Sequence, residues 1–460
     1  MNRLRLSFLE SWLKNKNRKP LVIRGARQVG KTWLVRELAR NAKRELVEIN
    51  FEDTPKKASF FESNDPFESL SMIESSLGRR LNPSKIILFL DEIQAAPELL
   101  AKLRWFAEKH PELPVIAAGS LLEFVLAKHT FSMPVGRIEY MHLEPLSFEE
   151  FVFARLGKTT CDFFKKTTLT SSIPAALHKQ FLQLFREYTI VGGMPEAVNC
   201  WIKKSSFIEV NKAHHNLLST YRDDFSKYQG KIESARLEDV IENIPRMIGT
   251  KFIYQHVNRS VSANSIKSAL ELLVKARICT KVSYCSANGI PLGAEVKSKS
   301  FKMLFLDVGL CNAALGLRLE PLLECEDLNF VNNGAISEQV VGQLLRALSP
   351  AYIEPKTYYW RKENPSANAE IDYLIQHHDS VVPIEVKSGS TGTLRSLHYF
   401  MQKKKNPIAI RINSDPPSLT EVNVKDHKGT PIQYKLLSLP FYLVEQTHRF
   451  LESLSIEYSL

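Results

Sequence analysis

The segment Gly25–Thr32, GARQVGKT, constrains the fold of this chain more than any other feature. It has the pattern G-x-x-x-x-G-K-[ST], follows the apolar run Leu21–Arg24 and precedes a helical pattern, TWLVRELAR. In such a strand–loop–helix context, backbone N–H groups and the helix N-terminus converge on phosphate oxygens. A chance glycine-rich turn would not need this placement, so the sequence predicts a phosphate-binding loop.

Each polar residue of this loop has an expected task. Lys31 is expected to neutralise the β- and γ-phosphates of ATP, and Thr32 is expected to bind Mg²⁺ through its hydroxyl group. The residues predicted to bind the nucleotide are Gly25, Ala26, Arg27, Gln28, Val29, Gly30, Lys31, Thr32, Asp91 and Ser120.

An acidic pair supplies the second half of the predicted site. The apolar run Ile86–Leu90 reads as a buried strand and ends in Asp91 and Glu92. Asp91 is expected to complete the magnesium shell, and Glu92 is expected to polarise the attacking water. Strands often end in acidic residues, so the pair gains its meaning from the phosphate loop that precedes it.

Three further residues have weaker expected roles. Ser120 ends a predicted strand and either senses the γ-phosphate or caps the strand. Gln94 either orients water or caps a helix. Arg137 is a candidate catalytic arginine that reaches the nucleotide of a neighbouring subunit, with an ordinary surface arginine as the alternative.

Alternation of short apolar runs with helical patterns predicts an α/β fold built on a parallel sheet. The runs are Leu21–Arg24, Leu46–Ile49, Ile86–Leu90, Val115–Ala118 and Ile138–Leu143. A region with helical spacing follows, then helices with a two-stranded hairpin typical of a winged helix, then a second α/β region. The predicted domains are residues 1–147 (nucleotide-binding core with an N-terminal helix), 148–240 (helical), 241–325 (winged-helix-like) and 326–460 (α/β).

The last region contains a second group of chemically active residues. Asp372 lies on one predicted strand, and Glu385 and Lys387 lie two positions apart on the next, so that they share a face. Glu338 lies on the preceding helix. Such carboxylates can bind a second Mg²⁺ or Mn²⁺ that polarises a scissile phosphate. A solvated hairpin shows the same spacing by chance, so fold and cutting activity are separate questions.

Composition narrows the class of partner. The net charge of +11 favours a polyanionic partner such as DNA, although a solvated basic surface explains it equally well.

Six cysteines without a C-x-x-C pair argue against a disulfide framework or a zinc site. No apolar run approaches the roughly 20 residues of a membrane span, and no secretory signal is evident. A cytoplasmic location is expected. The histidine pairs at 214–215 and 377–378 are expected to be solvated.

Several phrases resemble a prokaryotic family of AAA-type P-loop ATPases: RKPLVIRGARQVGKT, LDEIQ, AAGS and GRIEYMHLEPLSFEEF, with GGMPEAV and YRDDFSKY further on. The resemblance implies a five-stranded parallel core that binds Mg-ATP, a helical lid, a winged helix, and a C-terminal domain similar to PD-(D/E)xK nucleases, the restriction-endonuclease-like fold. An arginine finger at Arg137 would require a homo-oligomer. With Glu92 as the base, we expect an ATP-hydrolysing protein whose nucleotide state is coupled to nucleic-acid-associated domains. The alternatives are a nucleotide-gated DNA- or protein-binding module without catalysis, and an ATP-assisted metal-dependent nuclease.

Overall fold

The computed structural model describes residues 3–120, 122, 134–227, 234–317, 333–362, 369–388, 394–426 and 428–456, which include every predicted site residue. The chain forms two compact units. The first comprises Met1–Leu146 with Lys275–Ile278 and Ser349–Pro355. The second comprises Ser147–Val274, Cys279–Leu348 and Lys356–Leu460. Among the described helices, none has both the length and the apolar character needed to cross a bilayer.

The first unit is built on a five-stranded sheet in the order β2-β3-β4-β1-β5. All of its strand pairs are parallel, as the alternating sequence pattern predicted. The strands are β1 (Leu21–Arg24), β2 (Glu45–Asn50), β3 (Ile86–Asp91), β4 (Val115–Gly119) and β5 (Glu139–His142).

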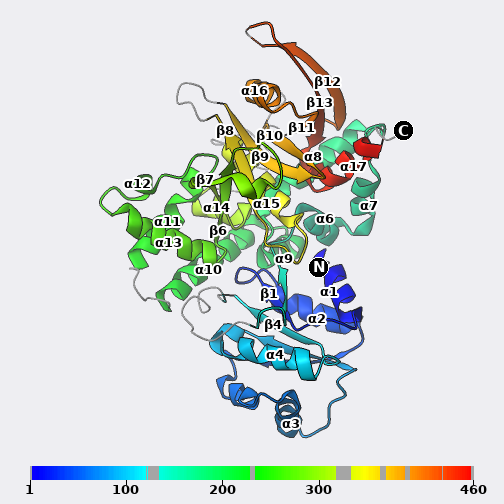
Figure 1. Cartoon of the computed structure of the whole chain (residues 1–460), viewed down its shortest axis with the longest axis vertical. Helices are drawn as coiled ribbons and strands as arrows, with labels where there is room; N and C mark the ends of the chain where they lie inside the picture. The colour runs from blue at the N-terminus through cyan, green and yellow to red at the C-terminus, as the bar shows by residue number, and fades with distance from the viewer. Residues whose placement is uncertain are drawn as a thin grey trace. The chain divides into compact units, whose positions relative to one another are not determined.

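Helices cover this sheet because each carries an apolar stripe (Figure 1). They are α1 (Arg5–Lys14), α2 (Lys31–Asn41), α3 (Pro66–Leu77) and α4 (Leu99–Lys109), with short 3₁₀ turns at Pro55–Phe61 and Ile93–Ala95. Helix α2 packs on β2, β3 and β4. Alternate strand residues, such as Leu88 and Leu90, join the apolar side chains of α3 and α4 in one core.

The second unit starts with the helical region that the sequence predicted. Its helices are α6 (Phe148–Leu156), α7 (Lys158–Lys166), α8 (Ala175–Val191), α9 (Pro195–Lys204), α10 (Phe207–Lys227) and α11 (Ser234–Asn243). Beyond this region lie α12 (Tyr254–Val257), α13 (Ala263–Lys275) and α14 (Val308–Ala314). Helix α6 begins with a capping box, in which Ser147 and Glu150 each satisfy the other's backbone N–H group.

The break between α8 and α9 has a specific cause. Gly192 has φ +73°, and a Cβ atom there would lie 2.1 Å from a carboxylate oxygen of Asp307. Only glycine therefore allows this approach. The carboxylate accepts hydrogen bonds from the backbone N–H of Gly193 (2.6 Å) and of Leu310 (3.1 Å), and the latter bond caps α14.

A single eight-stranded sheet dominates the rest of the unit, in the order β12-β13-β11-β10-β9-β8-β6-β7. Its strands are β6 (Cys279–Cys285), β7 (Val296–Phe305), β8 (Thr357–Arg361), β9 (Glu370–His377), β10 (Ser380–Val386), β11 (Ile408–Asn413), β12 (Ser418–Lys425) and β13 (Pro431–Pro440). The hairpin β6–β7, expected as a wing, extends this sheet because β6 pairs with β8 in parallel. The strands on both sides of the expected boundary at residues 325–326 thus belong to one sheet.

Helices pack on this sheet as well (Figure 1). Helix α15 (Asn333–Ala347) contacts β7, β8 and β10, while α16 (Arg395–Lys404) shares a buried core with Trp360 and Leu436. The last helix, α17 (Thr447–Ile456), follows a 3₁₀ turn at Phe441–Gln446.

Candidate functional site

The phosphate loop has the backbone that its sequence predicts. Lys31 begins α2, and Gly30, the residue before it, has φ +95°, which a residue with a side chain rarely adopts. Gly25 lies against the backbone of Leu143, since a Cβ atom there would be 2.5 Å from the carbonyl oxygen of Leu143. The two glycines therefore set the tight path of the loop around the start of α2.

Lys31 directs its charge into this loop. Its side chain is buried, and its Nζ donates hydrogen bonds to the carbonyl oxygens of Gly25 (3.1 Å) and Ala26 (2.9 Å). The ammonium group therefore lies across the loop where a phosphate charge is expected, held by weak backbone acceptors that an anion can replace.

Thr32 and Asp91 meet at the start of α2 and the end of β3. The Thr32 hydroxyl donates a hydrogen bond of 2.9 Å to Oδ2 of Asp91. Burial raises the pKa of Asp91 to about 6, opposed by the Thr32 hydrogen bond and reinforced by the charge of Glu92. A hydroxyl group beside a carboxylate is a hard oxygen pair of the kind that Mg²⁺ prefers. The residues present therefore fit Mg-ATP.

Glu92 and Gln94 are held together next to this pair. Glu92 has φ +51°, and Nε2 of Gln94 donates a hydrogen bond of 2.5 Å to Oε2 of Glu92. The same nitrogen lies 3.3 Å from Oε1 of Glu52. Gln94 therefore contacts the predicted base directly instead of capping a regular helix.

The two remaining candidates, Ser120 and Arg137, differ in how exposed they are. Ser120 is buried directly after β4, which pairs with both β3 and β1 in the sheet and so lies between the strands that carry Asp91 and the loop. Arg137 is half exposed, and its Nε donates to Oε1 of Glu108 on α4 at 2.8 Å. The first unit therefore gives Arg137 a surface ion pair.

In the second unit, the predicted acidic residues come together in one cluster. Asp372 accepts a hydrogen bond from the backbone N–H of Val386 (2.8 Å), which ties β9 to β10. Nζ of Lys387 lies 2.6 Å from Oε1 of Glu385. We use the name carboxylate cluster for Glu338, Glu370, Asp372 and Glu385 with Lys302 and Lys387.

Like Glu370 of β9, Lys302 of β7 is a member that the sequence did not predict. Its Nζ lies 3.0 Å from Glu338, 2.5 Å from Glu370 and 4.0 Å from Asp372, and its side chain is only 3% exposed. The sequence does contain one indication of an unusual lysine, because Lys302 lies between Phe301 and Met303 in the apolar half of a strand. This local pattern does not show which carboxylates Lys302 contacts, because they lie 36 to 70 residues further along the chain.

Burial dominates the electrostatics of the carboxylate cluster. It raises the pKa of Glu338 to about 8 and that of Glu385 to about 7, and the charge of Asp372 adds to both effects. Burial also raises the pKa of Asp372, although the charge of Lys302 opposes this.

These distances decide whether the cluster fits the predicted second metal ion. The Lys302 ammonium group already lies between the carboxylates of α15 and β9, where a shared cation would bind. With Lys302 in this position, the residues do not fit an additional Mg²⁺ or Mn²⁺, because like charges would share the same oxygen ligands.

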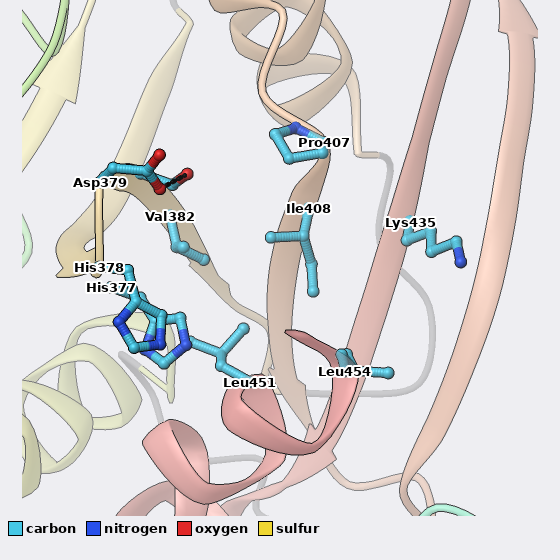
Figure 2. Close-up of a pocket in the computed structure, with 10 residues that line it drawn as sticks. His377, His378, Asp379, Val382, Pro407, Ile408, Lys435, Leu451 and Leu454 are labelled. Carbon is cyan, nitrogen blue, oxygen red and sulfur yellow. Dashed lines mark hydrogen bonds between the residues drawn. The ribbon is translucent and has the colours of Figure 1, made fainter. Parts of the chain in front are cut away.

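A separate cavity has a volume of about 250 Å³. Its lining includes His377, His378, Val382, Ile408 and Leu451 (Figure 2). Nε2 of His378 lies 2.8 Å from Oε2 of Glu452 on α17, and that of His377 lies 3.6 Å from the same oxygen. His378 is solvated as expected, with 58% of its side chain exposed, but His377 is only 12% exposed. His214 is fully buried, contrary to expectation, and its Nε2 forms a hydrogen bond with the carbonyl oxygen of Val191.

Comparison with known families gives three matches in order along the chain. Residues 17–152 match the family described as "AAA domain". Residues 182–320 and 333–424 match two families described as domains of unknown function, DUF8612 and DUF4143. No curated protein matches the chain.

The solved structures with some similarity are distant. The Walker-type ATPase PABY2304 of Pyrococcus abyssi aligns with a TM-score of 0.43 and 16% identity, over 68% of this chain and 95% of that chain. The Aeropyrum pernix ORC1 protein in complex with DNA aligns with a TM-score of 0.27 and 12% identity, over 70% and 95%. Caenorhabditis elegans PCH-2 gives a TM-score of 0.26 and 12% identity, over 44% and 62%.

The first unit therefore contains a P-loop domain of the AAA class, as its sheet, its loop and the family match at residues 17–152 agree. Domains of this class bind ATP together with Mg²⁺ and hydrolyse the ATP.

Proposed function

We propose that the protein is an AAA-type ATPase that hydrolyses Mg-ATP and couples its nucleotide state to the second unit. The observation that carries this proposal is the bond between Thr32 and Asp91 beside the buried ammonium group of Lys31. It supports an arrangement in which the ligands of Mg²⁺ and the phosphate-binding charge lie together at the start of α2.

Each residue has a proposed role in the reaction. Lys31 neutralises phosphate charge, and Thr32 and Asp91 hold Mg²⁺, which would stabilise the charge that develops on the phosphate oxygens. Glu92 accepts a proton from the attacking water, and Gln94 restrains Glu92 through the hydrogen bond between them. Ser120 contacts the nucleotide from the adjacent strand.

Turnover tests this proposal directly. The purified protein is expected to release phosphate from ATP in the presence of Mg²⁺. The variant Glu92→Gln is expected to bind ATP with unchanged affinity and to lose about 100-fold or more in kcat. ATP binding without turnover, or equal rates in the wild type and Glu92→Gln, would contradict the role of Glu92.

We also propose the domain boundaries given by the sequence, at residues 147/148, 240/241 and 325/326, with a helical lid, a winged helix and a nuclease-like domain. The order of α11, α12, α13 and the hairpin β6–β7 supports a winged-helix-like segment, although its hairpin is part of the large sheet. Helix α15, followed by β8, β9 and β10 with their acidic residues, supports the nuclease-like order.

For the function of the second unit, we favour binding of DNA or of a protein partner without cleavage of nucleic acid. The excess of basic residues in the sequence supports a polyanionic partner. The position of Lys302 in the carboxylate cluster disfavours metal-dependent cleavage. The alternative, an ATP-assisted nuclease, draws support from the convergence of Glu338, Asp372, Glu385 and Lys387.

A plasmid assay separates these two outputs. Supercoiled DNA is incubated with the protein and Mg²⁺ or Mn²⁺, with and without ATP. A shift in mobility with intact DNA supports binding without cutting. Nicking that disappears in both Asp372→Ala and Lys387→Ala supports the nuclease.

We finally propose that the protein acts in the cytoplasm as a homo-oligomer in which Arg137 reaches a neighbouring subunit's nucleotide. Arg137 would first have to leave Glu108, with which it pairs at the surface. A specific ATPase rate that rises with protein concentration, and a loss of this rise in Arg137→Ala, would support the proposal. A rate that is independent of concentration and unchanged in Arg137→Ala would remove it.

A further inference from the structure

We propose that the ammonium group of Lys302 is the resident cation of the carboxylate cluster, and that it occupies a latent site for one Mg²⁺ or Mn²⁺. The inference concerns the second unit alone. It goes beyond the proposed ATPase function and holds whether or not the first unit hydrolyses ATP.

The contacts of Lys302 resemble those of a bound metal ion. Its Nζ has carboxylate oxygens of Glu370 at 2.5 Å and Glu338 at 3.0 Å, and that of Asp372 is at 4.0 Å. These groups come from α15 and β9, two elements far apart in the sequence. Because Mg–O distances are about 2.1 Å, the two closer ligands would need to move inward by less than about 1 Å to bind such an ion.

The surroundings fix Lys302 in this position. Its Cα position pairs with Val282 in the β6–β7 ladder, and its Nζ lies 5.4 Å from the ring centroid of Tyr359. The side chain is 3% exposed. The ion pairs with Glu370 and Glu338 therefore hold the ammonium group among the carboxylates.

A second observation indicates that a divalent cation fits the cluster in place of the ammonium group. Oε2 of Glu385 has no hydrogen-bond partner, although Glu385 is only 5% exposed. Buried carboxylate oxygens normally have partners, and a divalent cation that replaces the Lys302 ammonium group is the class of ligand that would supply one.

Replacing the ammonium group tests the proposal. The full-length protein is made without an affinity tag and with Asp91→Asn, so that Mn²⁺ near the phosphate loop is not counted. Bound Mn²⁺ is then measured by electron paramagnetic resonance without nucleotide. The variant Lys302→Met, which keeps the side-chain length without the charge, is expected to bind one more Mn²⁺ per chain than the protein with Lys302.

Matched variants assign the bound ion to the cluster. Lys302→Arg keeps a positive charge and is expected to bind no Mn²⁺ there. Adding Asp372→Asn to Lys302→Met is expected to remove the new site. Should Lys302→Met be unfolded without metal, it is refolded with millimolar Mn²⁺, and folding that depends on Mn²⁺ counts for the proposal.

Three outcomes would overturn it. One is that the protein with Lys302 already binds Mn²⁺ and that the substitution Asp372→Asn abolishes this binding. Another is a folded Lys302→Met variant without an additional Mn²⁺. The third is a Lys302→Met variant that stays unfolded even with Mn²⁺ present.

Discussion

The side-chain nitrogen of Gln94 donates a hydrogen bond to the carboxylate of Glu92, 2.5 Å away. Gln94 is buried, and Glu92 adopts a left-handed backbone conformation with φ +51°. The same nitrogen also approaches Glu52 of the loop after β2. The contact restrains the carboxylate that we propose as the base, so Gln94 controls how freely Glu92 meets the attacking water.

Substitution of Gln94 is therefore expected to change turnover without changing ATP binding. A hydrogen bond to a charged group contributes about 1.5–3 kcal/mol, so release of Glu92 in Gln94→Ala is expected to raise kcat by about tenfold or more. The affinity for ATP is expected to stay within about twofold, because Gln94 touches neither Lys31 nor Thr32. Phosphate release under saturating ATP measures the first quantity, and fluorescent-nucleotide binding measures the second. A large loss of kcat would instead make Gln94 a residue that positions the water.

A second prediction concerns the hydroxyl group of Thr32, which bonds to Asp91 at 2.9 Å. Thr32→Ala removes one proposed oxygen ligand of Mg²⁺, and Thr32→Ser retains it. We expect the Mg²⁺ concentration for half-maximal ATPase activity to rise about tenfold in Thr32→Ala and to change little in Thr32→Ser. Equal shifts in both variants would point to a packing role of the Thr32 methyl group.

The sequence predicted the first unit well because its signals are local. A strand such as β1 is a short apolar run followed by a loop motif, and its predicted bounds, Leu21–Arg24, agree with the structure. The sheet around β12 and β13 was not predicted. In β12 (Ser418–Lys425), half-buried residues such as Val422 and Val424 alternate with exposed ones, but none is fully buried, and the strand is stabilised by pairing with β13. That pairing depends on tertiary structure more than on local pattern.

The same limit applies to the sites. Glu385 and Lys387 share a face because of the two-residue period of a strand, which can be read from the sequence. Lys302 reaches the carboxylate cluster only because β6 pairs with β8. This pairing joins distant segments and cannot be predicted from the local sequence pattern. Likewise, Gln94 contacts Glu92 because a 3₁₀ turn at Ile93–Ala95 follows β3, where a helix cap was one of two expectations.

A third prediction concerns the buried carboxylate of Asp307. It accepts hydrogen bonds from the backbone of Gly193 and Leu310 and from Nε2 of Gln343 (3.0 Å). Asp307→Ala leaves these donors without an acceptor, so we expect the free energy of unfolding to fall by about 3–5 kcal/mol. Urea unfolding followed by circular dichroism measures the change. Asp379→Ala, at an exposed turn, is the matched control and is expected to cost less than about 0.5 kcal/mol.

The last prediction is a pH dependence caused by His214. Burial lowers the pKa of His214 to about 4, below the ordinary value of 6.5, although its hydrogen bond to Val191 opposes the shift. Between pH 6.5 and pH 4 the unfolded chain therefore binds more protons at this residue than the folded chain does. The folded state is expected to lose stability as the pH falls through this window, by up to about 3 kcal/mol, and to gain nothing further above about pH 7.

The variant His214→Gln isolates this effect, because glutamine keeps an N–H donor for the Val191 carbonyl group and does not titrate. Urea unfolding at pH 5 and pH 7 gives two free energies for each protein. Other groups, including the acids of the carboxylate cluster, contribute equally to both proteins and cancel in the difference. We expect the wild type to lose about 2 kcal/mol more than His214→Gln between pH 7 and pH 5. Parallel losses in the two proteins would show that the pKa of His214 is not lowered in the folded state.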